Sequence, residues 1–258
     1  MPAFSRSRFA RWQVSAVVLV LLAALASPLH AEDGAAGRHS LRPNSYILVG
    51  FVGGFVHHDN PHHGPVFMAG HISRDFPNDA YVQVFENRHR NAAYQTILRL
   101  LDSNHDGVLR QEEKAEARII LFGQSWGASA VVMLARKLDR AGIPVLLTVQ
   151  VDSVAKPFEH DGVIPANVAA AVNFYQPRGF VHGRSLIRAA DPARTRILGN
   201  YLYDYHQTPV TCEGMPWIER TFIPGHMHTE CDVNLWSQVE SLVRQYMDAS
   251  HLIVASNP

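Results

Sequence analysis

Residues Arg118 to Leu138, RIILFGQSWGASAVVMLARKL, decide the fold. This stretch begins with an apolar β-type run, passes through Gly123-Gln124-Ser125-Trp126-Gly127, and continues with apolar residues at the 3.6-residue spacing of a helix. A serine between two glycines at a sharp strand-to-helix turn is the context of the G-x-S-x-G nucleophile motif. The glycines avoid side-chain clashes at such a turn, and the helix N-terminus offers free N–H groups to a developing negative charge. We therefore interpret Ser125 as a nucleophile rather than as a bystander in a glycine-containing turn.

Apolar runs elsewhere predict further strands alternating with helices. Besides the strand that starts at Ile119, the expected strands are residues 45–49, 80–85, 143–151, 167–175 and 194–202. The expected helices, besides the one that follows Ser125, are residues 92–101, 111–117 and 237–247. This alternation predicts a mostly parallel sheet flanked by helices, with right-handed crossovers, in a single α/β domain.

The composition fits one globular domain, because 47% of the 258 residues are hydrophobic and 18% are charged. The formal net charge of +0 gives no electrostatic reason to expect a nucleic-acid partner. The sequence leaves the oligomeric state open.

The N-terminus has the order of a secretory signal peptide. Three arginines, Arg6, Arg8 and Arg11, precede an apolar segment from Val14 to Ala26, and small residues follow up to Ala31. We predict a signal peptide at residues 1–31 and a mature domain at residues 32–258, secreted or periplasmic. The apolar segment is short for a transmembrane span, so we expect no stable membrane span after cleavage.

From about Tyr46 to Tyr246 the chain resembles the α/β-hydrolase fold, specifically lipase- or esterase-like serine hydrolases. The resemblance rests on the motif around Ser125 and on weaker motifs elsewhere. It departs from the family pattern at Gln124, where such relatives often carry histidine. The resemblance implies a serine, an acid and a histidine in that chain order.

Asp152 is the expected acid, because it ends the strand that follows the helix after Ser125, level with the nucleophile. Asp191 is the alternative candidate for the acid, although the proline after it is typical of a turn. The expected base is His226, which stands about ten residues before Trp236 as in the resembling family. His228 in the same loop is the alternative base.

The resemblance also implies two backbone N–H donors for an oxyanion, from Phe51 in the glycine-containing loop after the first strand and from Trp126.

The expected function is an exported serine hydrolase that cleaves ester-type bonds of a small-molecule or lipid-like substrate without an organic cofactor. The alternative is a catalytically silent hydrolase-like protein that binds calcium or another metal and interacts with a partner.

Residues 102–113 match the calcium-loop pattern D-x-[DN]-x-[DN]-G-x5-E without a mismatch. Gly107 allows the sharp turn that such a loop needs. The expected calcium ligands are Asp102, Asn104, Asp106, the backbone carbonyl of Val108, and Glu113. We predict a single structural calcium site, an EF-hand-like loop between a helix and the strand that leads to Ser125.

Histidines are frequent between the first two strands, at His57, His58, His62, His63 and His71. Imidazole is a common ligand for zinc and other transition metals, so a metal cluster is one interpretation. Prolines and a glycine interrupt regular geometry here, and we favour a polar loop near the mouth of the active site.

Cys212 and Cys231 are the two cysteines of the chain. In an exported protein such a pair favours a disulfide, which would hold the segment that carries the late histidines. Two buried free thiols are the alternative.

Overall fold

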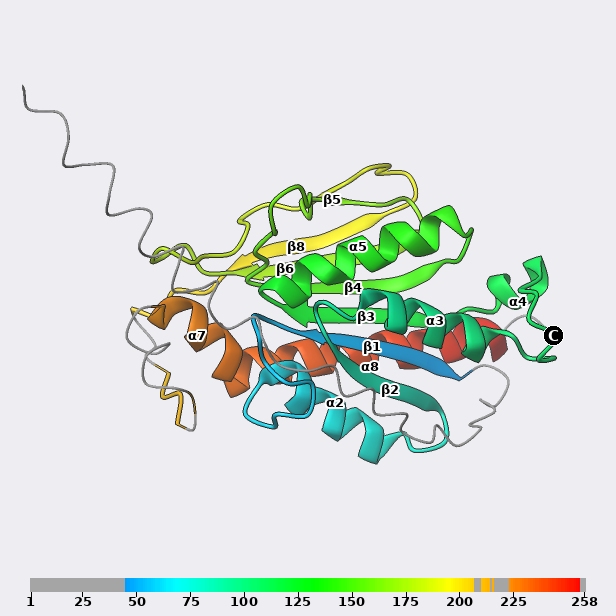
Figure 1. Ribbon diagram of the computed structural model, residues 1–258, viewed down its shortest axis with the longest axis horizontal. Coiled ribbons are helices and arrows are strands. Elements are labelled where there is room, and N and C mark those ends of the chain that lie inside the picture. The colour runs from blue at the N-terminus through cyan, green and yellow to red at the C-terminus, as the bar shows by residue number, and fades with distance from the viewer. Residues whose placement is uncertain (1–44, 207–209, 214, 216–222, 256–258) are drawn as a thin grey trace, which may run out of the picture. The chain divides into compact units, whose positions relative to one another are not determined.

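The computed structural model describes residues 45–206, 210–213, 215 and 223–255 (Figure 1). These residues belong to one compact unit and form a single α/β domain. The predicted signal peptide, residues 1–31, and the connector that follows it lie outside the described residues. In the described part of the chain no helix has the length and apolar character needed to cross a membrane.

The chain alternates between strands and helices along most of its length. The strands are β1 (Tyr46–Val52), β2 (Ala80–Glu86), β3 (Ile119–Gln124), β4 (Val145–Val151), β5 (Val163–Ile164), β6 (Val168–Tyr175), β7 (Arg188–Ala189) and β8 (Arg196–Leu202). The helices are α2 (Gly64–Asp75), α3 (Arg90–Leu101), α4 (Gln111–Ala115), α5 (Trp126–Arg140), α7 (Pro224–Cys231) and α8 (Val233–Ala255).

Six strands form the central sheet in the order β2-β1-β3-β4-β6-β8, and every neighbouring pair is parallel. The chain passes from β1 to β2 on one side and then crosses to β3 on the other. The carboxyl ends of β1 and β3 therefore frame a topological switch point, which is where open α/β sheets bind their ligands. The short strands β5 and β7 pair separately.

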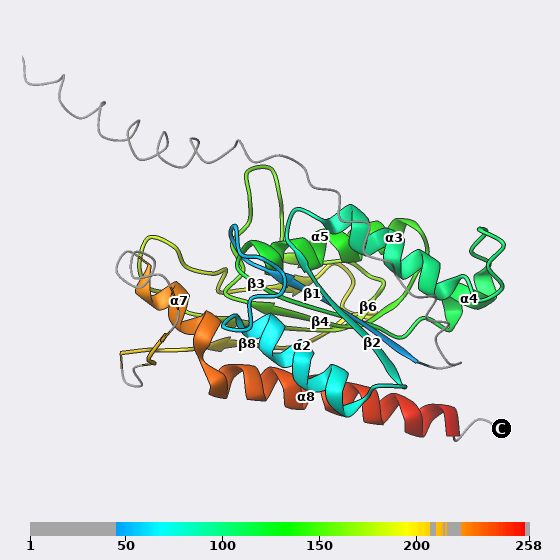
Figure 2. The same ribbon diagram turned by 60° about the horizontal axis from the view of Figure 1, so that its bottom comes forward.

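Helices cover both faces of the sheet, with α3 and α5 on one face and α2 and α8 on the other (Figure 2). Successive side chains of a strand point to opposite faces. Along β1, Ile47 and Val49 accordingly pack in the core on the α5 side, whereas Tyr46 and Leu48 pack in the core on the α8 side. A sheet buried on both faces explains the nearly continuous apolar runs in its strands.

The predicted α/β class and parallel sheet are confirmed, and each predicted strand overlaps a strand of the sheet. Two helices lie in segments that we expected to be loops. The first is α2. Pro65 stands in its first turn, where the backbone N–H that proline lacks has no partner within the helix, so the proline does not prevent the helix. The second is α7, which also begins with a proline and carries His226. The closing helix α8 is longer than predicted.

Candidate active site

Ser125 lies at a strained turn between β3 and α5. Its backbone has φ 56° and ψ −126°, a region that residues other than glycine avoid, at a cost of about 1–3 kcal/mol. A Cβ on Gly127 would lie 2.3 Å from the carbonyl oxygen of Phe51, and one on Gly123 would lie 2.7 Å from the backbone of Gly127. Both glycines are therefore needed for the close approach of β1, β3 and α5.

Ser125, His226 and Asp152 form a continuous hydrogen-bonded chain. The Ser125 Oγ lies 2.8 Å from His226 Nε2, and His226 Nδ1 lies 2.7 Å from Asp152 Oδ2. His226 and Ser125 are each 6% exposed, and Asp152 is fully buried. Three side chains that are distant in sequence are thus brought together at the carboxyl edge of the sheet.

The buried Asp152 carboxylate has further partners. Its Oδ1 accepts hydrogen bonds from the backbone N–H of Gly183 (2.6 Å) and of Gln176 (3.1 Å), and its Oδ2 accepts one from the Gln176 side-chain amide (3.0 Å). A side chain at position 183 would place Cβ 2.3 Å from Oδ1. Donors of this kind compensate for removing a carboxylate from water.

Nothing in the sequence marks Gln176 or Gly183 as residues with a role in the site. Gln176 follows β6, next to Asp152, which follows β4. The adjacency of β4 and β6 brings the amide to the carboxylate. An amide gives no chemical signal in the sequence alone, so this role could be found only once the strand order was known.

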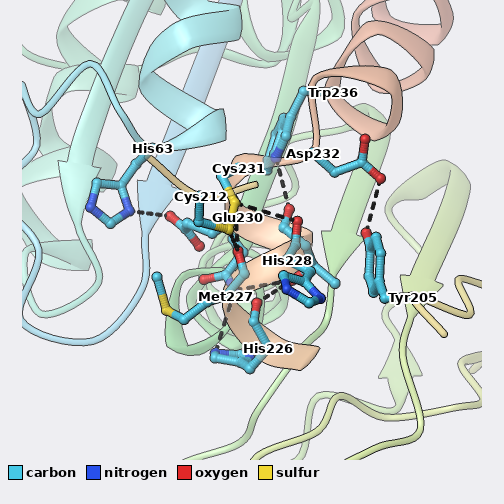
Figure 3. Close-up of a disulfide and its surroundings, with 12 residues drawn as sticks. His63, Tyr205, Cys212, His226, Met227, His228, Glu230, Cys231, Asp232 and Trp236 are labelled. Atoms are coloured by element: carbon cyan, nitrogen blue, oxygen red, sulfur yellow. Dashed lines mark hydrogen bonds and ion pairs between the residues drawn. A yellow bond between two sulfur atoms is a disulfide. The ribbon is translucent and has the colours of Figure 1, made fainter. Parts of the chain in front are cut away.

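The helix α7 positions His226 and is held from several sides (Figure 3). The Thr229 hydroxyl donates to the His226 carbonyl at 2.7 Å, and the Trp236 indole N–H donates to the Thr229 carbonyl at 3.0 Å. Glu230 forms a buried ion pair with His63, which precedes α2. These contacts join α7 to α2 and α8, on the face of the sheet opposite α5.

Cys212 and Cys231 are paired at disulfide distance, with their Cα atoms 5.5 Å apart (Figure 3). Cys231 is the last residue of α7. The pair therefore fixes the end of the helix that carries His226, as the sequence predicted for this segment.

His228 is not in contact with Ser125 or Asp152. Its ring packs edge-on against Tyr205, with the ring centroids 5.2 Å apart, and burial lowers its pKa. Its Nδ1 is buried and has no hydrogen-bond partner among the described residues. The structure brings His226, and not His228, to the serine.

Asp191 also lies apart from this chain of contacts. It accepts a hydrogen bond from the backbone N–H of Ala193 (3.0 Å) in the turn before β8. This is the turn role that the following proline favours.

The N–H groups near Ser125 differ in their availability. Trp126 is the first residue of α5, so its N–H has no partner within the helix. Phe51 lies inside β1 and is fully buried. The Ile47 N–H donates to the Arg118 carbonyl, which immediately precedes β3. Because the N–H groups of every second residue in a strand point to the same side, the N–H of Phe51 also points to β3. Gly53, the residue after β1, closely approaches the nucleophile, since a Cβ there would lie 2.8 Å from that of Ser125.

The surface beside the nucleophile is apolar on one side. Phe55, which is 68% exposed, packs edge-on against Trp126 with the ring centroids 5.5 Å apart. The Lys156 ammonium also lies 5.0 Å from the Trp126 ring centroid, and burial lowers the pKa of this lysine.

The acidic loop at residues 102–113 is closed by its own hydrogen bonds. Gly107, with φ 78°, donates its N–H to Asp102 Oδ2 at 2.9 Å, and Asp106 N donates to Asn104 Oδ1 at 2.9 Å. The Val108 N–H donates to Asp106 Oδ1 at 2.8 Å. The glycine therefore makes the turn that the sequence pattern predicts.

Glu113 is engaged at the end of this loop. Its two oxygens accept hydrogen bonds from the backbone N–H groups of Arg110 and Ser103, each at 2.9 Å, and the first of these chiefly lowers its pKa. Asp106 pairs with Arg110 at 2.7 Å. Asp102 Oδ1 is buried and accepts no hydrogen bond from the described residues. Binding an ion here would require Glu113 to exchange its present partners for the ion.

Comparison with models of known protein families gives no match, and comparison with curated protein sequences gives no significant similarity. The fold and the site thus define a parallel α/β domain with a buried Ser-His-Asp arrangement, and any activity must be argued from the site itself.

Proposed function

We propose that this protein is a serine hydrolase that cleaves ester-type bonds through an acyl-enzyme. The observation that carries the proposal is the hydrogen-bonded chain from Ser125 Oγ through His226 to Asp152, at 2.8 Å and 2.7 Å. A serine hydroxyl is a weak nucleophile until a base removes its proton, and a carboxylate must orient that base. The fold class alone does not imply this chemistry.

In the proposed mechanism, His226 Nε2 removes the proton of Ser125 as the oxygen attacks the ester carbonyl. Asp152 holds His226 in the tautomer with the proton on Nδ1 and stabilises the imidazolium that forms. His226 then gives the proton to the leaving alcohol. Water attacks the acyl-enzyme with His226 again acting as base, and Ser125 is regenerated.

The oxyanion requires two N–H donors that are free of other partners. Trp126 remains the proposed second donor, since its N–H has no partner within the helix. For the first donor we favour the Gly53-Gly54 backbone over Phe51, because the ladder between β1 and β3 uses the N–H of Phe51. Removing one such donor typically lowers turnover by about 100- to 1,000-fold.

The proposed substrate class rests on the aromatic side chains of Phe55 and Trp126. Trp126 follows Ser125 in the chain, and the exposed ring of Phe55 packs against it. An aromatic surface of this kind fits the hydrocarbon part of a small or lipid-like ester. We further propose export to an oxidising compartment, which the sequence of residues 1–31 and the paired cysteines support.

Turnover of p-nitrophenyl esters of increasing acyl length tests this function. We expect hydrolysis by the wild-type protein and its loss in Ser125→Ala. Ser241→Ala is the matched control, because this exposed hydroxyl bonds only the preceding turn of α8 at the Ser237 carbonyl. A folded wild-type protein that hydrolyses none of the series, or a Ser125→Ala variant that retains full turnover, would refute the proposal.

We also propose that residues 102–113 bind calcium in a structural role. Asp102, Asn104, Asp106, the Val108 carbonyl and Glu113 are the proposed ligands, and the buried free oxygen of Asp102 supports the assignment. Calcium prefers such oxygen ligands. A chelator should lower the melting temperature of the wild-type protein but not that of Glu113→Gln, while the preference for acyl length stays the same. Equal melting of the wild-type protein with and without chelator would contradict a structural ion.

A further inference from the structure

A second cluster of side chains lies at the same edge of the sheet, beyond the Ser125 chain. His57 and His58 belong to the loop after β1, and Glu86 is the last residue of β2. Because β1 and β2 are parallel neighbours, with Val52 paired to Glu86, this loop stands next to the Glu86 carboxylate. The Asn87 amide donates to the Gly54 carbonyl at 2.6 Å and ties the two segments together.

The two imidazoles converge on one carboxylate oxygen. His57 Nε2 and His58 Nδ1 each lie 3.8 Å from Glu86 Oε1, and the three potential ligand atoms all lie within 4.8 Å of one another. These distances are too long for hydrogen bonds. The two distances of 3.8 Å to Glu86 Oε1 exceed by about 0.4–0.5 Å the separation of about 3.3–3.4 Å between two ligands of a tetrahedral ion with bonds of about 2.0–2.1 Å. A small movement of the exposed side chains would complete such a site.

The orientation of His57 is fixed by a neighbouring carboxylate. Its Nδ1 lies 2.5 Å from Asp59 Oδ1, so the ring donates its Nδ1 proton to Asp59 and turns Nε2 towards Glu86. The same hydrogen bond chiefly raises the pKa of His57. A histidine whose other ring nitrogen donates to a carboxylate is the usual arrangement around protein-bound metal ions.

The surroundings of Glu86 leave one side of the cluster open. Glu86 is only 3% exposed, and Arg88 forms an ion pair with its Oε2 while Oε1 faces the two imidazoles. The His57 and His58 side chains are 64% and 49% exposed. Three protein ligands with a solvent-facing side are typical of a site that keeps a position for water or for an oxygen of a bound molecule.

We propose that His57, His58 and Glu86 bind a divalent transition-metal ion of the zinc class, with Asp59 orienting His57. Two other histidines of this segment have carboxylate partners of their own. His63 pairs with Glu230, and His71 pairs with Glu240. The donor set of two nitrogens and one oxygen suits zinc rather than calcium, which prefers oxygen ligands alone.

This site does not depend on the proposed ester hydrolysis, since it shares no residue with the Ser125 chain. Zinc binding that persists in Ser125→Ala separates the two proposals. Failure of either one leaves the other standing.

Zinc titration of the untagged chain by calorimetry, in excess calcium to saturate the acidic loop, tests the proposal. We expect one zinc ion per chain in the wild-type protein and in His62→Ala, which removes an exposed histidine of the same loop. The double variant His57→Ala/His58→Ala should lose this binding. Because both side chains are well exposed, the substitutions should leave folding intact, as circular dichroism can verify.

Two further variants and a spectroscopic measurement sharpen the test. Asp59→Asn should weaken zinc binding about 10- to 100-fold, the usual effect of losing the partner of a ligating histidine. Cobalt(II) bound in place of zinc should give the visible absorption of a tetrahedral ion in the wild-type protein, and His57→Ala/His58→Ala should abolish it. No zinc binding by the wild-type protein, or equal binding by the double variant, would overturn the proposal.

Discussion

Replacing Asp152 by asparagine tests the Ser125 chain by exchanging a single carboxylate oxygen for an NH2 group. Oδ1 accepts from two backbone N–H groups, those of Gly183 and Gln176, at 2.6 Å and 3.1 Å. The asparagine oxygen therefore favours this position, because an amide NH2 there would face two donors, whereas at the Oδ2 position it faces one, the Gln176 side-chain amide. The NH2 is then left at the Oδ2 position, 2.7 Å from His226 Nδ1. It would donate to that nitrogen and force the proton onto Nε2.

A proton on Nε2 prevents His226 from accepting the proton of Ser125. The uncharged amide also no longer stabilises an imidazolium. In serine hydrolases that use such a triad, the equivalent change lowers kcat about 10,000-fold, which is about 5.5 kcal/mol in the barrier. We expect a loss of this size for Asp152→Asn in ester turnover, with the substrate still bound.

The control for this variant is Asp191→Asn, which changes a carboxylate in the turn before β8 and should leave kcat unchanged. Circular dichroism and thermal melting establish that both variants are folded. A folded Asp152→Asn protein whose kcat stays within about tenfold of the wild-type value, about 1.4 kcal/mol, would refute the tautomer argument.

Three further predictions concern single side chains. Gln176→Met removes an amide that donates to the buried Asp152 carboxylate and to the Val181 carbonyl and that accepts from the Arg178 N–H. It should lower the free energy of unfolding in urea by about 1.5–3 kcal/mol, and an unchanged value would contradict these contacts. His226→Ala should abolish ester turnover whereas His228→Ala should not, and the reverse result would exchange their roles. Asp59→Asn should bring the raised pKa of His57 back towards its ordinary value in metal-free protein, as an NMR titration can measure; a pKa that does not fall would mean that Asp59 does not hold the ring.

The fold was largely predictable because its signals are local. An apolar run followed by a glycine-flanked serine and an amphipathic helix identifies β3 and α5 without reference to other segments. The helix α2 was missed because Pro65 was interpreted as an interruption, although proline in the first turn is compatible with a helix. Most of the stability of such a helix comes from tertiary packing, here against α8, which a local pattern does not report.

The site was predictable only in part. Asp152 could be selected because it ends a buried strand, but the choice of His226 over His228 rested only on the resemblance while their segment was considered a loop. In a helix, residues two apart point about 200° from each other, so α7 directs one imidazole to Ser125 and the other to Tyr205. Glu86 was overlooked because its meeting with the histidine loop depends on β1 and β2 being neighbours.

The role of Ser125 as the nucleophile is tested by identifying the residue that a fluorophosphonate probe modifies. A Ser125 nucleophile activated by His226 should give one adduct per chain, located on Ser125 by mass spectrometry of the digested protein, and the adduct should be lost in folded His226→Ala. An unmodified wild-type protein, an adduct at another residue, or equally fast labelling without the imidazole would rule out this nucleophile and base.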